Sequence, residues 1–209
     1  ARLGRLLELF RTADPAVDVT QTSKSVSGVI FIRDVEDTSG KNNYNMYFSR
    51  ILSDGTVPAA PLNLTQNNLW WDGVIEGVPF FYEPRITAVQ NRFVLTWMTN
   101  YVYKIADLPI SYSQIMVAAY DENGVQVTAP TTLAASSAEI SYHASQIARY
   151  DDNHIFLTYF THEPNAITDK WKLWLVILDG QGKNPSSPKL IGAATGDSLD
   201  MVKISDKMF

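Results

Sequence analysis

The three histidines of the chain are the first residues to test for catalytic or metal-binding chemistry. His154 stands beside two aspartates in a predicted turn, and His143 and His162 flank a predicted pair of strands. Imidazole groups bind zinc at spacings such as H-x-H or H-E-x-x-H, and neither spacing occurs here. We therefore interpret the histidines as surface or loop residues, and we predict no metal site and no cofactor.

Carboxylates offer a second kind of chemistry, because a pair of Asp or Glu side chains can hydrolyse a glycosidic bond. Asp72, Glu76 and Glu83 lie close enough in the sequence to supply such a pair. An ordinary acidic loop has the same composition, and the sequence contains no G-x-S-x-G, P-loop or G-x-G-x-x-G motif. We predict no catalytic residue.

The acidic stretch 34–43 lacks the spacing of a calcium-binding loop, so we interpret it as a polar hairpin loop.

Aromatic residues give the stronger signal for binding. Five of them lie on or beside predicted connections between strands: Trp70, Trp71, Tyr82, Tyr101 and Tyr103. Exposed rings of this kind contact the apolar faces of sugars and anchor protein partners. We predict that these residues bind a glycan or a protein partner. The alternative, that they plug a central channel or cover a sheet edge, stays open.

A strand, a tight glycine turn, a second strand and a proline-marked exit follow one another three times in the sequence. The three copies cover residues 45–64, 114–133 and 171–191. Another pair of predicted strands precedes each copy, most clearly at 84–97 and 145–159, where a Leu-Thr-aromatic triplet recurs. One unit therefore contains four strands in about 60 residues. A single four-stranded sheet cannot cover both of its faces, so we expect such units to stack face to face.

The chain resembles β-propeller repeat proteins over residues 16–209, in particular diverged ones with a D-x-x-G turn on the outer hairpin of each blade. The resemblance depends on the turns 121–124 and 179–182 and on a diverged copy at 53–55. It implies an all-β fold, a partial β-propeller of about three and a half four-stranded antiparallel blades. WD40 and sialidase turn motifs are absent, so the turns indicate fold and no activity. A β-sandwich is the alternative fold.

These patterns predict the following organisation. A short N-terminal helix at 1–15 has apolar residues at helical spacing and ends at an Asp-Pro pair. Propeller-like units follow at about 16–64, 84–135 and 144–192, and a truncated fourth unit begins at 196–209. Three and a fraction blades do not close a ring, so we expect further blades or a partner chain in the native object.

The amino-acid composition argues against several classes of function. The formal net charge of −5 and the scattered basic residues argue against binding to a nucleic-acid backbone. The absence of cysteine excludes disulfides and thiolate chemistry. No apolar run reaches the length of about 20 residues that a transmembrane helix needs. Strands rich in Thr, Tyr, Trp and Val, with Asn and Ser in the loops, favour an extracellular or cell-surface location.

We therefore predict a non-catalytic scaffold or binding module, a fragment of a larger protein or assembly. Two alternatives stay open. The chain could belong to a propeller glycosidase or lyase completed by further blades, and carboxylates or arginines would then converge on the axial face. It could also be an assembly subunit whose N-terminal helix and open blade edges are interfaces.

Overall fold

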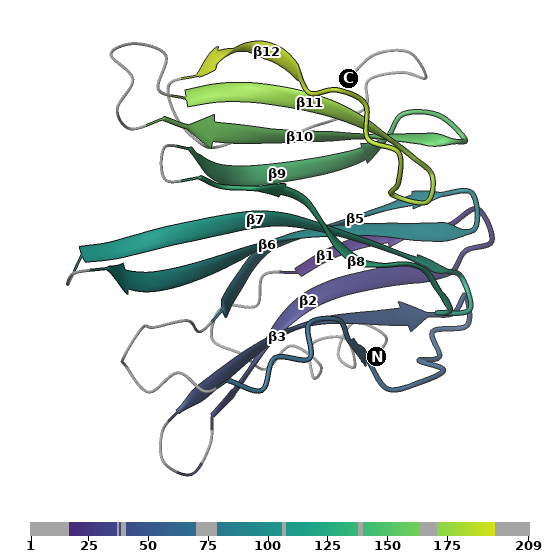
Figure 1. The fold of residues 1–209 in the computed structure, drawn as a ribbon. Coiled ribbons are helices and arrows are strands. Elements are labelled where there is room, and N and C mark those ends of the chain that lie inside the picture. The colour runs from purple at the N-terminus through teal and green to yellow at the C-terminus, as the bar shows by residue number, and fades with distance from the viewer. Residues whose placement is uncertain are drawn as a thin grey trace.

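The computed structural model describes residues 17–36, 38, 41–69, 79–105, 108–137, 140–163 and 171–194. These residues form three four-stranded antiparallel sheets without a helix, which confirms the predicted all-β class (Figure 1). The predicted N-terminal helix at 1–15 and the predicted fourth unit at 196–209 lie outside the described residues. In this described part of the chain, no helix has the length and apolar character needed to cross a membrane.

Each sheet is a meander of four strands that pair with their neighbours in the sequence. Sheet A contains β1 (Val17–Gln21), β2 (Ser27–Glu36), β3 (Asn42–Ile51) and β4 (Leu62–Asn63). Sheet B contains β5 (Pro79–Val89), β6 (Arg92–Ile105), β7 (Leu108–Asp121) and β8 (Gln126–Ala135). Sheet C contains β9 (Ser141–Arg149), β10 (His154–His162), β11 (Trp171–Asp179) and β12 (Lys189–Ala194).

The three predicted glycine turns share one backbone geometry. Gly55, Gly124 and Gly182 have φ angles of 85°, 80° and 70°, a left-handed conformation that glycine adopts without steric cost. The N–H of each glycine donates to the carbonyl oxygen three residues earlier, at 2.8, 2.9 and 2.9 Å. The turn repeat seen in the sequence is therefore also a repeat of structure.

Sheet B is buried on both faces, because apolar residues occupy both sets of alternating positions on its central strands. On β6, Phe93, Leu95 and Trp97 pack against sheet A, whereas Val94 and Met98 pack against sheet C. All five side chains are at most 1% exposed. Successive strand residues point to opposite faces, so one strand contributes to two cores.

The first strands of the three sheets lie together. Among the described residues, β5 contacts β1, β2 and β3, and β9 contacts all four strands of sheet B. The Asp18 carboxylate on β1 accepts a hydrogen bond from the Ile86 N–H on β5 at 2.8 Å. The Glu83 carboxylate on β5 accepts one from the Ser145 N–H on β9 at 3.1 Å. From this common region the sheets spread apart, so that β12 and β3 lie at opposite ends of the molecule (Figure 1).

The strands of sheet B are longer than the sequence pattern predicts. That pattern begins the second unit at about residue 84, whereas β5 begins at Pro79, and only residues 106–107 separate β6 from β7. Pro84 suggests a strand boundary because it lacks an N–H. In the structure it lies at a register shift between Tyr82 and Arg85, a bulge where the ladder does not need that donor.

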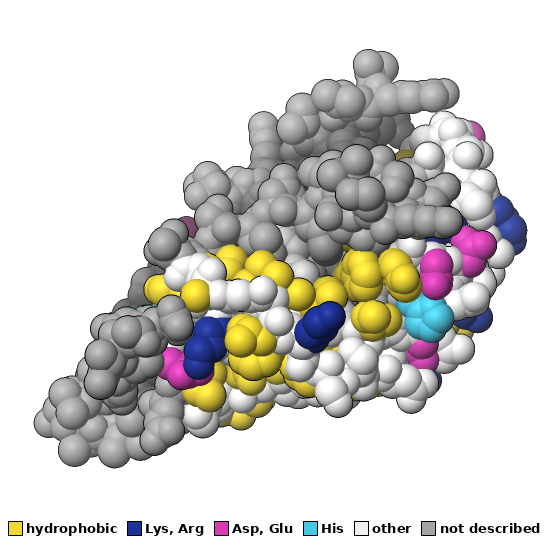
Figure 2. All heavy atoms as spheres, turned by 90° about the horizontal axis from the view of Figure 1, so that it is seen from above, with side chains coloured by type: hydrophobic (Ala, Val, Ile, Leu, Met, Phe, Trp, Pro, Cys, Tyr) yellow, Lys and Arg dark blue, Asp and Glu magenta, His cyan; other side chains and the backbone are white. Residues whose placement is uncertain are grey.

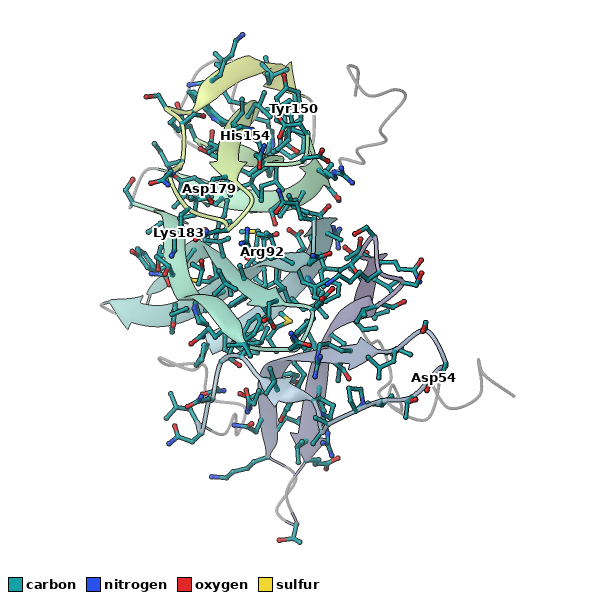
Figure 3. All side chains as sticks on the ribbon, turned by 90° about the vertical axis from the view of Figure 1, so that its right-hand side faces the viewer. Asp54, Arg92, Tyr150, His154, Asp179 and Lys183 are labelled. Carbon is teal, nitrogen blue, oxygen red and sulfur yellow. The ribbon has the colours of Figure 1, made fainter. Side chains whose placement is uncertain are left out.

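Asp179 stabilises the turn that follows β11 in sheet C. Its Oδ1 accepts hydrogen bonds from the backbone N–H groups of Gln181 and Lys183 at 2.8 and 2.9 Å, and Asn184 donates to Oδ2 at 2.7 Å. Burial alone would raise the pKa of Asp179, but these hydrogen bonds and the Lys183 charge hold it below its usual value. Figure 3 shows Asp179 and Lys183 together, far from Asp54 in the corresponding turn of sheet A.

Replacing Asp179 with alanine should lower the free energy of unfolding by about 1 kcal/mol, the typical value for a side chain that caps backbone N–H groups. Because the folded-state pKa is lowered, this contribution is present above about pH 4 and is lost as the pH falls through the folded-state value. Urea unfolding should separate wild type from Asp179→Ala at about pH 7 and bring them together at about pH 2. A difference that persists unchanged at the acidic pH would contradict this account.

Gly28 on β2 marks a close approach between sheets A and B. A Cβ atom at this position would lie 2.6 Å from Phe93 Cδ1 and 3.0 Å from Ile86 Cδ1. Both neighbours belong to the core between the two sheets, so Gly28→Ala should cost about 1–3 kcal/mol of stability by overpacking. Gly192→Ala on β12 is the matched control, because a Cβ there meets no atom within 4 Å. Equal urea midpoints for the two variants would refute the expected clash.

Candidate functional site

The structure describes the side chains of two of the five aromatic residues predicted to bind a partner, Tyr82 and Tyr101. Trp70 and Trp71 lie outside the described residues, and only the backbone of Tyr103 is described. The interpretation of these residues as loop aromatics is wrong for the three tyrosines, which lie on β5 and β6. The physical reason is that aromatic side chains favour a pleated, half-buried surface, so the tyrosine-rich stretch continues the strands.

Tyr82 faces sheet C. It pairs with Met98 across the ladder, and both side chains pack in the core between sheets B and C. Burial raises the pKa of Tyr82 to about 12, and the neighbouring Glu83 carboxylate adds to the shift. The bulge at Pro84 explains this orientation. It inserts one residue, so Tyr82 and Ile86 point to opposite faces although their spacing in an unbroken strand would place them on the same face.

Tyr101 faces the other side of sheet B and lines a cleft of about 200 Å³ between sheets A and B. The cleft has an apolar part and a polar part, drawn from strands β5 to β8 of sheet B and from the chain after β4. Its apolar lining is Leu64, Pro79, Phe81, Trp97, Met116 and Pro130, and its polar lining is Thr65, Asn67, Thr99, Tyr101 and Gln114. None of these side chains carries a formal charge at neutral pH, so the cleft suits a neutral group.

Trp97 supplies an unpaired donor at this cleft. The side chain is 1% exposed, and among the described residues its indole Nε1 has no hydrogen-bond partner. A buried indole N–H normally finds an acceptor, and leaving a buried donor without one costs about 1–3 kcal/mol. The cleft therefore has aromatic side chains in its lining, and one of them, Trp97, carries a buried donor without a partner among the described residues.

An asparagine network holds the sheet A wall of the cleft. Asn45 Oδ1 accepts hydrogen bonds from the Asn67 N–H at 2.7 Å and from Thr65 Oγ1 at 2.9 Å. Asn43 Nδ2 donates to the carbonyl oxygens of Asn67 and Leu69, at 3.1 and 2.8 Å. These bonds attach the chain after β4 to β3, so the wall is preorganised. Sequence analysis missed this network; alternating asparagines on a strand are the signal that could have indicated it.

The structure brings His143 and His162 together, with 6.2 Å between their ring centroids, and keeps His154 apart from them. His154 and His162 lie at opposite ends of β10, about 26 Å apart for a strand rise of about 3.3 Å per residue. His154 contacts the exposed Asp151 carboxylate, with 3.0 Å between Nδ1 and Oδ1. His162 stacks on Trp171 at 4.3 Å between ring centroids, and His143 lies at 4.9 Å from the same ring. Within the described ranges, no three metal-binding side chains form a group that could hold an ion.

Of the three carboxylates considered for glycoside hydrolysis, the structure describes Glu83, which accepts the Ser145 N–H hydrogen bond given above. Asp72 and Glu76 lie outside the described residues. In the acidic stretch considered for calcium, burial and then the neighbouring Glu36 raise the pKa of Asp34.

No protein-family model, curated protein or solved structure matches this chain. Its function must therefore be inferred from the cleft and from the packing of the sheets.

The titration of Tyr82 provides a test of its buried position. Its pKa is about 12 in the folded protein and about 10 in an unfolded chain, so the folded state favours the neutral phenol. This stabilisation is complete below about pH 10 and is lost as the pH rises toward 12. Tyr82→Phe should therefore show a shallower fall in unfolding free energy over this range than wild type. Identical pH profiles for the two proteins would place Tyr82 in solvent.

Proposed function

We propose that this chain is a non-catalytic scaffold and binding module, built from consecutive blades of a β-propeller, and that the cleft between sheets A and B binds one neutral sugar ring of a glycan. The observation that carries the proposal is the uncharged lining of the cleft, in which the aromatic side chains of Phe81, Trp97 and Tyr101 lie with the amides of Asn67 and Gln114. An extracellular or cell-surface location, favoured by composition, is where such a ligand is encountered.

The chemistry of the cleft supports a sugar as its ligand. A pyranose ring has an apolar C–H face, which can pack on the ring of Tyr101, and hydroxyl groups, which can bond the amides of Asn67 and Gln114. The volume of about 200 Å³ is below the roughly 300–1,000 Å³ of pockets for drug-sized ligands. The cleft therefore suits a single ring, with the rest of a glycan outside it.

The packing of the sheets supports the blade arrangement over a β-sandwich. A sandwich has two sheets that bury one face each. In this chain sheet B is covered on both faces, and β1, β5 and β9, which begin the three meanders, lie together. The carboxylates of Asp18 and Glu83 accept hydrogen bonds from backbone N–H groups, which supports a structural role for them. A structural role for these carboxylates in turn supports a non-catalytic scaffold.

Titration of ¹⁵N-labelled protein with neutral hexoses and N-acetylhexosamines tests the proposal. The indole N–H resonance of Trp97, assigned with the variant Trp97→Phe, should shift on addition of at least one of these sugars. Gln114→Ala and Tyr101→Ala should each weaken binding about tenfold, the loss expected for one hydrogen bond or ring contact. Tyr47→Ala is the matched control, because Tyr47 stacks on Phe31 on the face of sheet A that points away from the cleft.

Two outcomes would overturn the proposal. If the Trp97 resonance shifts only with amino-acid amides, the cleft receives a side chain of a protein partner. If it shifts with neither class, the cleft does not bind a ligand of this size.

A further inference from the structure

A pocket of about 230 Å³ lies where the turns of sheets B and C meet. Its lining comes from the turn between β5 and β6, the turn between β9 and β10, and the turn after β11. The charged or ionisable side chains of this lining, which we call the turn pocket, are Arg92, Asp152, His154 and Asp179. Figure 3 faces this end of the molecule, with His154, Asp179 and Arg92 one below another.

The carboxylates at this end of the molecule already have partners within the chain. Asp179 accepts the three hydrogen bonds described above. Asp152 forms an ion pair with Arg149, and the neighbouring Asp151 contacts the His154 ring. Figure 2 shows a histidine at the right of the molecule with acidic side chains next to it and basic side chains nearby. These carboxylates therefore do not leave an unbalanced negative site.

The Arg92 guanidinium of the turn pocket has no such partner. Arg92 is the first residue of β6, and its side chain is half-buried. Within the described part of the chain, no hydrogen bond or ion pair joins its guanidinium to another group. A guanidinium presents its N–H donors as a planar fork that matches the two oxygens of a carboxylate. Arg92 is therefore the cation of this pocket that is available to a ligand.

The turns after β7 and β11 have the same hydrogen bonds, so the two junctions between sheets can be compared residue by residue. The aspartate that begins each turn accepts from the backbone N–H groups two and four residues later, at 2.8–2.9 Å. The next residue is Glu122 in sheet B and Gly180 in sheet C. Their N–H groups donate to the carbonyl oxygens of Asn91 and Asn153, at 2.9 and 2.5 Å. Glu122 and Gly180 are therefore equivalent positions.

The junction between sheets A and B contains a carboxylate of the chain itself. The Glu122 side chain is only 16% exposed, and its carboxylate pairs with Lys24 from the turn between β1 and β2. Arg50 Nη1 also donates to the Glu122 carbonyl oxygen at 2.5 Å. At the junction between sheets B and C, Gly180 supplies no side chain, and the turn pocket lies beside it. Arg92, like Lys24, comes from the first hairpin of the preceding sheet.

We propose that the turn pocket binds the carboxylate of a small organic acid, with Arg92 as its cationic partner. The ligand carboxylate takes the place that the Glu122 side chain has at the other junction. A singly charged acid suits the pocket best, because Asp152 and Asp179 in the lining repel anions of higher charge. This site is separate from the cleft between sheets A and B, so it does not depend on the proposed sugar binding.

Titration of ¹⁵N-labelled protein with sodium acetate tests the site, because acetate is a singly charged carboxylate that is small enough for the pocket. The Arg92 Nε–H and Gly180 N–H resonances should shift and reach saturation as acetate is added. Sodium chloride at the same ionic strength should not produce these shifts. Equal shifts with chloride, or tighter binding of inorganic phosphate than of acetate, would overturn the proposal of a carboxylate site.

The variant Arg92→Gln removes the charge and keeps a polar side chain. It should weaken acetate binding at least about tenfold, measured at the Gly180 N–H, because a charge-assisted hydrogen bond is lost. Arg33→Gln is the matched control, since Arg33 is exposed on β2 in sheet A, and it should leave the affinity unchanged. An unchanged affinity in Arg92→Gln would refute the role of Arg92.

The variant Gly180→Glu tests the comparison of the two junctions, because it gives sheet C the carboxylate that sheet B has. The Arg92 Nε–H resonance of this variant should no longer respond to acetate. Gly180→Ala is the matched control and should keep the response. Both variants add a Cβ atom 3.0 Å from Val89 Cγ1, so they share this contact and differ in the carboxylate. Equal acetate affinity in the two variants would show that the position of Glu122 is not the ligand site.

Discussion

The dominant constraint on this chain is that sheet B is apolar on both faces. An antiparallel sheet with one solvated face alternates apolar and polar residues, but β6 runs Phe93-Val94-Leu95-Thr96-Trp97-Met98 with every side chain fully buried. Neither face of such a sheet is suited to contact with water. It must be covered twice, and the stacking of sheets A, B and C follows from this requirement.

The close packing of successive sheets restricts which residue types fit at positions along their interfaces. Gly28 lets β2 pass over Phe93, and Gly182 brings the outer turn of sheet C down onto Val117. The Asp18 carboxylate satisfies a backbone N–H of the adjoining strand, where β1 and β5 belong to different sheets and form no ladder with each other. These are local solutions to one problem, the close approach of successive sheets.

The cleft arises where this packing ends. Along β6 the side chains facing sheet A change from Phe93 and Leu95 in the core to Trp97 beside the cleft and Tyr101 at its lining. The wall opposite is the chain after β4, which is held by the asparagines of β3 instead of by a ladder. The cleft is therefore formed by the strands of sheet B on one side and by a hydrogen-bonded segment on the other.

The sequence predicts the hairpins well, because their signals are local. The glycine turns at 121–124 and 179–182 and the alternation around them require no knowledge of the rest of the chain. The direction of Tyr82 could not be predicted in the same way, since a single bulge at Pro84 reverses the face of the β5 residues before it. The cleft was also beyond local reasoning, because Asn67, Trp97 and Gln114 come from three separate segments. In the sequence alone, the Asn and Gln side chains are indistinguishable from the ordinary polar residues of loops and strands.

The position of sheet B has a consequence for cooperativity. Each sheet bonds internally and packs only on its sequence neighbours, so the stability of the described part is close to a sum of sheet terms and nearest-neighbour interface terms. Sheet B belongs to both described interfaces. Adjacent residues such as Phe93 and Val94 therefore couple sheets A and C, which have no core in common. Loosening β6 would uncouple the two ends of the array, and in that sense the middle meander determines whether the three sheets unfold as one unit or as separate ones.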